Sequence, residues 1–291
     1  MLKHWLLASR PKTLIASVLP VVSGSLLAYE NSQKSSISVS MLCLLYCIFI
    51  QIGTNFSNDY FDFKKGADKN RVLGPKRMVS SGLLVPKQVL VASLLILALG
   101  FAIGLLIMVI VGGSKVLLLV GVTSFLCALG YTGGPFPLAY RGLGDLFVIL
   151  FFGLVAVETT HYVLCLSVGL IWQPNWILSI GVGFVINNLL VVNNYRDYLE
   201  DLKIGKKTTV VIFGLKFGRF LFLIGVLVST LLIPVLVPSA WSTIFLLPLG
   251  LFLWLKLHKA LIYKDYSRIL SLCAVMILFY TLFLLFGYLA E

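Results

Sequence analysis

The sequence predicts an all-α fold, a polytopic membrane bundle of about nine transmembrane helices that forms a single domain over residues 1–291. Hydrophobic residues make up 59% of the 291 residues and charged residues only 12%, roughly half the charged share of a typical soluble domain. The mean hydropathy is +1.02. Apolar runs of about 18–22 residues, the length of a helix that spans a bilayer, recur along the chain.

The expected spans follow one another through mostly short connections. They lie near residues 13–30, 37–58, 87–111, 114–131, 143–165, 175–195, 216–236, 240–257 and 269–289. No Ser-rich or Pro-rich linker divides them, so we expect one membrane domain. No small-residue cleavage site follows the first span, which we therefore expect to be retained.

The distribution of Lys and Arg predicts the orientation of the spans. With the N-terminus in the cytoplasm, all 23 Lys and Arg except Lys34 and Lys115 fall on the cytoplasmic side, as the positive-inside rule requires. We therefore expect a multi-pass protein of the cell inner (plasma) membrane whose long cytoplasmic loops carry its chemistry. The same rule accounts for the net charge of +12, so nucleic acid is not an expected partner.

Two similar acidic segments follow the second and the sixth expected spans. Residues 59–66 read D-Y-F-D-F-K-K-G, and residues 197–205 read D-Y-L-E-D-L-K-I-G, the same string with one residue inserted. Asn55 and Asn193 stand four residues before the first Asp of each segment. If the helices continue past the membrane, Asp59 and Asp62 share one face, and so do Asp197 and Asp201. We expect two pseudo-symmetric halves of one site.

Four converging carboxylates would repel one another unless cations lie between them. Oxygen ligands of this kind suit Mg²⁺, whose coordination is usually completed by water and substrate phosphates. Basic residues follow or flank both segments, at Lys64, Lys65, Lys69, Arg71, Lys76, Arg77, Arg196, Lys203, Lys206 and Lys207. A diphosphate with an apolar tail would satisfy the metals, the bases and the membrane setting together. The alternative for any single Lys is an ordinary loop charge at a helix end.

These motifs resemble the UbiA superfamily of intramembrane aromatic prenyltransferases, which has two aspartate-rich motifs at the cytoplasmic ends of helices 2 and 6. The resemblance extends over nearly the whole chain. It rests on N-x-x-N-D-Y-x-D-x-x-x-G-x-D at 55–68, G-P-x-R at 74–77, S-G at 81–82, Y-T-G-G-P at 131–135 and D-x-x-x-D-x-x-x-G-K-x-T at 197–208, with W-L-L-A-S-R-P-K-T-L at 5–14 and L-A-Y-R-G-L-G-D at 138–145. Within the superfamily the motifs are similar to those of the 1,4-dihydroxy-2-naphthoate polyprenyltransferases, the MenA type. Lys207 departs from the pattern, since that branch commonly has Arg there.

The resemblance implies an Mg²⁺-dependent enzyme in the lipid bilayer that joins a polyprenyl diphosphate to 1,4-dihydroxy-2-naphthoate with decarboxylation. The product is demethylmenaquinone, on the way to menaquinone. It further implies metal binding by Asp59, Asp62, Asp197 and Asp201, with Asn55 and Asn58 as catalytic residues that orient the carboxylates or contact phosphate. The alternative for these two amides is to bridge helices by hydrogen bonds. Expected substrate-binding residues are Lys64, Arg71, Arg77, Tyr131, Arg141, Asn193, Lys203 and Lys207. Alternatives are a related enzyme that uses 4-hydroxybenzoate, homogentisate or another ring, and a secondary transporter.

Glu158 and His161 stand one helical turn apart within the fifth expected span. Ionisable groups at such a depth are costly and often functional. They are expected to form either an acid–base relay or polar pocket, or a pair that is satisfied against a neighbouring helix.

Overall fold

The computed structural model describes residues 1–30, 33–34, 36–68 and 73–290, and within them it is helical with only an isolated bridge between Arg141 and Lys207. The α-helices are α1 (Leu2–Ala8), α2 (Ile15–Glu30), α3 (Ile37–Lys64), α4 (Pro86–Ile110), α5 (Lys115–Gly130), α6 (Gly144–Val148), α7 (Ala156–Ser167), α8 (Trp176–Arg196), α9 (Tyr198–Lys203), α10 (Thr209–Phe213), α11 (Leu215–Leu227), α12 (Ile233–Leu236), α13 (Leu247–Lys259) and α14 (Tyr263–Ala290). Three 3₁₀ segments, η1 (Pro11–Thr13), η2 (Leu138–Tyr140) and η5 (Pro238–Leu246), and two π-helical segments, η3 (Ile149–Val155) and η4 (Val228–Leu232), connect or extend them. The predicted all-α class is confirmed.

Each expected span corresponds to one helix or to successive helical segments. In chain order these are α2, α3, α4, α5, α6 with η3 and α7, α8, α11 with η4 and α12, η5 with α13, and α14. Among the described residues, seven helices are long and apolar enough to cross a membrane, and the bent pair Leu2–Thr13 and Ile15–Glu30 adds an eighth if it is one span. The helix α5 is apolar but has only 16 residues. The predicted count of nine spans is therefore not confirmed, although the polytopic membrane bundle is.

The helix α8 lies at the centre of the bundle. Of its most apolar window 67% is buried inside the protein, against 17% for α3. Its close packing against η3 depends on small residues, since a Cβ on Gly153 would lie 2.5 Å from the carbonyl oxygen of Ser179. Small residues allow such close backbone approach between membrane helices. The outer helices present many large apolar side chains at the surface, as contact with lipid requires.

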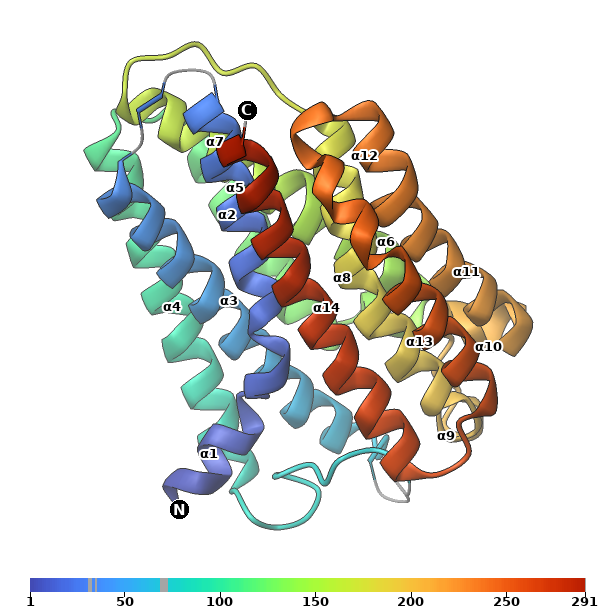
Figure 1. Cartoon of the computed structure of the whole chain (residues 1–291). Coiled ribbons are helices and arrows are strands. Elements are labelled where there is room, and N and C mark those ends of the chain that lie inside the picture. The colour runs from blue at the N-terminus through green and yellow to red at the C-terminus, as the bar shows by residue number, and fades with distance from the viewer. Residues whose placement is uncertain (31–32, 35, 69–72, 291) are drawn as a thin grey trace.

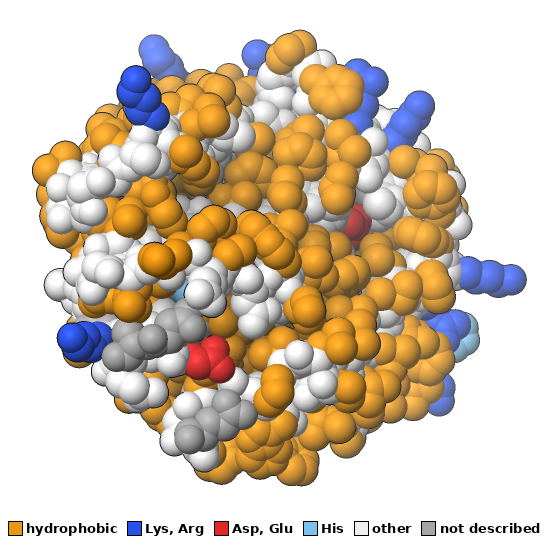
Figure 2. All heavy atoms as spheres, turned by 90° about the horizontal axis from the view of Figure 1, so that it is seen from above, with side chains coloured by type: hydrophobic (Ala, Val, Ile, Leu, Met, Phe, Trp, Pro, Cys, Tyr) orange, Lys and Arg blue, Asp and Glu red, His pale blue; other side chains and the backbone are white. Residues whose placement is uncertain are grey.

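The two ends of the bundle differ in character. The N-terminus, the C-terminal end of α3 and the short helices α9 and α10 lie at the same end (Figure 1). The opposite end is covered mainly by hydrophobic side chains, and the Lys and Arg that are visible in this view lie at its rim (Figure 2). Both acidic segments therefore lie at one end, as the sequence predicts.

Glu158 and His161 lie toward the other end, where α7 meets the start of α8. The Glu158 carboxylate accepts hydrogen bonds from the Asn175 backbone N–H at 3.1 Å, from the Ser179 hydroxyl at 2.5 Å and from the Trp172 indole N–H at 3.2 Å. His161 Nδ1 lies 3.5 Å from the same carboxylate. These contacts satisfy Glu158 against the neighbouring helix, whereas both ring nitrogens of the buried His161 lack a hydrogen-bond partner among the described residues, so the structure does not decide between the two expected roles.

Candidate active site

The last turns of α3 carry the first acidic motif. The helix has 28 residues, which at 1.5 Å per residue is about 42 Å and exceeds the roughly 30 Å of a bilayer's apolar layer. Its C-terminal turns can therefore extend beyond the lipid. Asn55, Asn58, Asp59 and Asp62 are all buried there, and their spacing places them along one side of the helix, as the sequence predicts.

Asn55 and Asn58 of α3 each form a hydrogen bond with a neighbouring segment of the chain. Asn55 Nδ2 donates to the backbone carbonyl of Ser9 at 2.9 Å. The Thr132 hydroxyl donates to Asn58 Oδ1 at 2.8 Å. The N-terminal segment and the loop after α5 are thus held against the acidic motif, and neither amide contacts the Asp carboxylates directly by a hydrogen bond among the described residues.

Each of the two Asp carboxylates of α3 accepts a hydrogen bond from a neighbouring segment. Asp59 Oδ2 accepts from the Met78 backbone N–H at 3.2 Å, and Asp62 Oδ1 accepts from the Tyr140 hydroxyl at 2.7 Å. Asp59 Oδ1 is buried and has no hydrogen-bond partner among the described residues. A buried carboxylate oxygen left in this state calls for a cation or a donor from a ligand.

The second motif differs in one respect from the expected continuous helix. The helix α8 ends at Arg196, and Asp197 separates it from α9, which carries Asp201. The prediction that Asp197 and Asp201 share one unbroken helix is therefore wrong. A backbone hydrogen bond of 2.8 Å from the Asp201 N–H to the Asp197 carbonyl still spans the break. The buried Arg196 guanidinium donates two hydrogen bonds, of 2.6 and 2.7 Å, to the Asp197 carboxylate.

Tyr140 and Lys206 connect the two motifs. Tyr140 donates to Asp62, the Lys206 ammonium lies 5.3 Å from the centre of the Tyr140 ring, and that ammonium lies 3.5 Å from Asp201 Oδ1. Burial, followed by the negative charge of Asp62, raises the pKa of the Tyr140 phenol, so it remains a protonated donor. The structure thus brings together two acidic segments that are about 140 residues apart in the sequence.

Arg10 is a site residue that sequence reasoning assigned only to the membrane orientation. It adopts a left-handed backbone, with φ 54° and ψ 63°, an uncommon conformation for a residue other than Gly. This corner lies between α1 and η1, just before the 48° bend into α2. Its guanidinium acts electrostatically on both Asp59 and Asp62. The family-like segment at 5–14 contains Arg10 but does not indicate its role, because that role depends on how the bend sets the N-terminal segment against α3.

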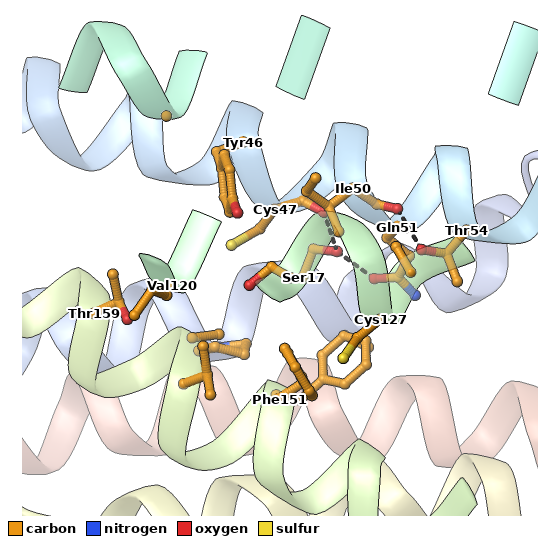
Figure 3. A pocket seen from close by; sticks show the side chains of 18 of the residues that line it. Ser17, Tyr46, Cys47, Ile50, Gln51, Thr54, Val120, Cys127, Phe151 and Thr159 are labelled. Carbon is orange, nitrogen blue, oxygen red and sulfur yellow. Dashed lines mark hydrogen bonds between the residues drawn. The ribbon is translucent and has the colours of Figure 1, made fainter. Parts of the chain in front are cut away.

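A cavity of about 320 Å³ opens beside the two motifs and continues into the bundle. Its polar end includes Arg10, Asn55, Asn58, Tyr131 and Asn193, so α3 and α8 both contribute to it. Most of the rest of its wall is apolar and comes from α2, α4, α5, η3 and α7 (Figure 3). Its volume lies within the range of about 300–1,000 Å³ of small-molecule sites.

A second cavity of about 250 Å³ lies on the other side of Arg10. Asp59, Arg77 and Met78 contribute to its wall together with Arg10. Arg77 Nε lies 3.5 Å from Asp68 Oδ1, and Arg77 also acts electrostatically on Asp59 and Asp62. Arg10 therefore stands between an apolar cavity and a charged one.

The other expected substrate-binding residues have different surroundings. Asn193 lines the main cavity, but its amide donates to the Leu189 carbonyl of its own helix, at 2.9 Å, and not to the second acidic motif. Arg141 is exposed, and its guanidinium lies 4.8 Å from the centre of the Phe136 ring. Three expected bases, Lys64, Lys203 and Lys207, have exposed side chains, and Arg71 lies outside the described residues.

The acidic groups are suited to share a metal with a ligand. Among the described residues, no three His, Cys, Asp or Glu side chains come close enough to hold a metal ion by themselves. This arrangement fits Mg²⁺, which is commonly bound by one or two carboxylates together with water and substrate phosphates. The Asp59 oxygen that has no partner among the described residues, together with the Arg77 and Arg10 side chains that act on this carboxylate, suits such a shared metal and anion.

Residues 17–287 match the UbiA prenyltransferase family. This chain belongs to that family. It is 35% identical over 224 residues to a 1,4-dihydroxy-2-naphthoate octaprenyltransferase of Haemophilus influenzae, with 75% of this chain and 71% of the relative covered. It is 34% identical over 253 residues to the Mycobacterium leprae protein of the same name, with 85% and 83% covered.

Solved structures show the same fold. A UbiA homolog from Aeropyrum pernix superposes with a TM-score of 0.71 at 15% identity, covering 97% of this chain and 98% of the homolog. A UbiA homolog from Archaeoglobus fulgidus, solved with DMAPP and Mg²⁺, superposes with a TM-score of 0.59 at 17% identity, covering 96% and 99%.

Proposed function

We propose that this chain is an aromatic polyprenyltransferase that transfers a polyprenyl group from polyprenyl diphosphate to 1,4-dihydroxy-2-naphthoate. The observation that carries the proposal is the cavity whose polar end, at Asn55, Asn58 and Asn193, adjoins the two acidic motifs and which continues between apolar walls. Such a cavity suits a ligand with a charged head and an apolar tail. The relatives at 34–35% identity carry the name of this activity.

The polar end of the cavity would bind the diphosphate. Mg²⁺ held by Asp59 and Asp62 on one side, and by Asp197 and Asp201 on the other, would neutralise the charge of the departing diphosphate. Tyr140 and Arg196 keep two of these carboxylates in fixed orientations. Arg77 and Lys206 already lie beside acidic groups of the site, so they are the bases that we assign to the diphosphate, with Lys64, Lys203 and Lys207 in more distant support. The assignment of Arg71 to the diphosphate remains a prediction from the sequence.

The reaction replaces one bond to the prenyl group by another. The allylic carbon–oxygen bond breaks, and its electron pair leaves with the diphosphate. The ring carbon that carries the carboxylate then bonds to the prenyl carbon, and the carboxyl group departs as CO₂ and returns its electron pair to the ring. The apolar wall excludes water, which would otherwise capture the prenyl cation. Arg10, at the junction of the charged and apolar parts, is the base that we assign to the acceptor's carboxylate.

The membrane setting follows from the same arrangement. We propose that the end carrying the acidic motifs faces the cytoplasm of a plasma (inner) membrane, because nearly all Lys and Arg fall on that side. A secondary transporter would place its site near the midplane, whereas this site lies at one end of the bundle.

The experiment is an assay of the purified protein with a labelled polyprenyl diphosphate and a panel of aromatic acids, with products identified by mass. We expect a preferred product from 1,4-dihydroxy-2-naphthoate that lacks the carboxyl group. A preferred product from 4-hydroxybenzoate or homogentisate would replace the acceptor, and uptake into proteoliposomes without diphosphate release would replace the enzyme by a transporter.

A further inference from the structure

A second polar group lies in the cavity, away from the acidic motifs. Gln51 is on the cavity wall, eight residues before Asp59 on α3, which is about 12 Å deeper along the helix axis. Gln51 Nε2 donates to the Thr13 carbonyl at 2.9 Å, and Gln51 Oε1 accepts from the hydroxyl of the buried Ser17 on α2. Figure 3 shows Gln51 and Ser17 joined at the cavity. We call these two side chains the Gln51 pair.

The Gln51 amide can form more hydrogen bonds than those seen among the described residues. A primary amide has two N–H donors and two acceptor lone pairs, and Gln51 uses one donor and one lone pair among the described residues. The side chain is only half-buried, because it borders the cavity. A group that both donates and accepts, such as a hydroxyl, would complete it.

An aromatic wall faces the same space. Phe147 and Phe151 line the cavity from the side of α6 and η3, and their rings are stacked with centroids 5.8 Å apart and planes 16° from parallel. Figure 3 shows Phe151 across the cavity from Gln51. Aromatic surfaces favour contact with another ring. A polyprenyl tail has no hydrogen-bonding group, so a hydroxylated ring fits these walls better than the tail does.

The structure assigns the Gln51 pair as the group that recognises the ring hydroxyl of the acceptor farther from the diphosphate. This inference rests on the proposed function and adds a specificity-determining residue to it. The reacting carbons of the two substrates must approach to about 3–3.5 Å, and the acceptor's aromatic ring must lie beyond them. Both fit within the distance of about 12 Å along the axis of α3 between Asp59 and Gln51. In 1,4-dihydroxy-2-naphthoate the hydroxyl concerned is the 4-hydroxyl, which is meta to the reacting carbon.

The test compares two acceptors, 1,4-dihydroxy-2-naphthoate and 1-hydroxy-2-naphthoate, in the wild type and in Gln51→Met. Met keeps the length of the side chain and removes its hydrogen bonds. The quantity measured is the ratio of kcat/KM for the two acceptors. When this ratio is compared between enzyme variants, the electronic effect of the missing hydroxyl on the acceptor's reactivity cancels. We expect Gln51→Met to lower the wild-type preference for the dihydroxy acceptor by at least about tenfold, which is about 1.4 kcal/mol. The KM for the polyprenyl diphosphate should stay the same.

Two further variants separate recognition from helix packing. Ser17→Ala is the milder change to the Gln51 pair and should lower the same preference in the same direction, which keeps the test decisive if Gln51→Met does not fold. Ser40→Ala is the matched control, because it removes a hydrogen bond of 3.2 Å between Ser25 and Ser40, also between α2 and α3, but away from the cavity wall. Its acceptor ratio should equal that of the wild type.

An acceptor ratio unchanged within about twofold in Gln51→Met and Ser17→Ala would overturn this inference while leaving the proposed function intact. An equal change in Ser40→Ala would also overturn it, since loosened packing would then explain the effect. If the wild type prenylated neither acceptor, the proposed function itself would fail, and the assignment of Gln51 with it.

Discussion

Asp59→Asn tests the chemistry at the acidic motifs with little disturbance of the fold. The Asp59 carboxylate uses one oxygen to accept the Met78 N–H, and its other oxygen is buried with no partner among the described residues. An Asn side chain of the same shape can keep its carbonyl toward Met78. The change is then confined to the second position, where an NH₂ group replaces a negatively charged oxygen.

The expected loss follows from what that oxygen would do. If it helps to hold Mg²⁺ against the diphosphate, the variant loses one preorganised charge at the point where the leaving group develops its own. Removal of one such group typically lowers kcat by about 10²–10³, or roughly 2.7–4 kcal/mol. Folding should not suffer, because burial raises the pKa of Asp59 in spite of the attraction of Arg77 and Arg10, so a neutral side chain is buried there more readily than a carboxylate. Asp197→Asn should lower kcat similarly, but it also breaks one of the two hydrogen bonds from the buried Arg196 and should therefore lower the melting temperature. The double variant should lose much less activity than the product of the two single effects.

The assay is turnover as a function of Mg²⁺ concentration for the single and double variants, with thermal melting as the control for folding. Near-wild-type turnover of both single variants at limiting Mg²⁺ would refute the reasoning. Fully multiplicative losses in the double variant would show that the two motifs do not serve one diphosphate.

Three further predictions concern other parts of the chain. Lys207→Arg should retain activity within about tenfold, or 1.4 kcal/mol, because the exposed side chain keeps its charge and the hydrogen bond from the Lys207 backbone N–H to the Tyr140 carbonyl is unaffected. Steady-state kinetics would show any larger loss. Glu158→Ala should lower stability by about 1–3 kcal/mol in thermal or denaturant unfolding, because three buried or half-buried donors lose their acceptor. The KM for both substrates should stay unchanged, and a selective loss of turnover would instead support a relay. Single cysteines at Lys76 and Lys203 should be labelled from the same side of sealed vesicles, and opposite accessibility would contradict a shared site.

The sequence predicted those parts of the site that depend on local spacing. The face shared by Asn55, Asp59 and Asp62 follows from helical periodicity alone, because α3 is unbroken to Lys64. The location of both motifs at one end follows from the alternation of apolar spans and the distribution of Lys and Arg. Neither inference needs knowledge of tertiary contacts.

The parts that were missed depend on contacts between distant segments. Tyr140 reaches Asp62 from 78 residues away, and Asn55 fixes the N-terminal segment through Ser9. The left-handed turn at Arg10 and the break at Asp197 are backbone changes that no local motif signals. The count of nine spans is not confirmed at α5 and at the bent N-terminal pair, because apolar composition does not determine where a helix begins, ends or bends.

The most direct test of the proposed reaction is the stoichiometry of its two leaving groups. Purified protein should receive a polyprenyl diphosphate and 1,4-dihydroxy-2-naphthoate labelled in its carboxyl carbon, and the released CO₂ and diphosphate should be measured together. We predict equal amounts of both, released only when Mg²⁺ and both substrates are present, together with a prenylated product that carries no label. Diphosphate release without CO₂, or a prenylated product that keeps the labelled carboxyl, would contradict transfer with decarboxylation at this site.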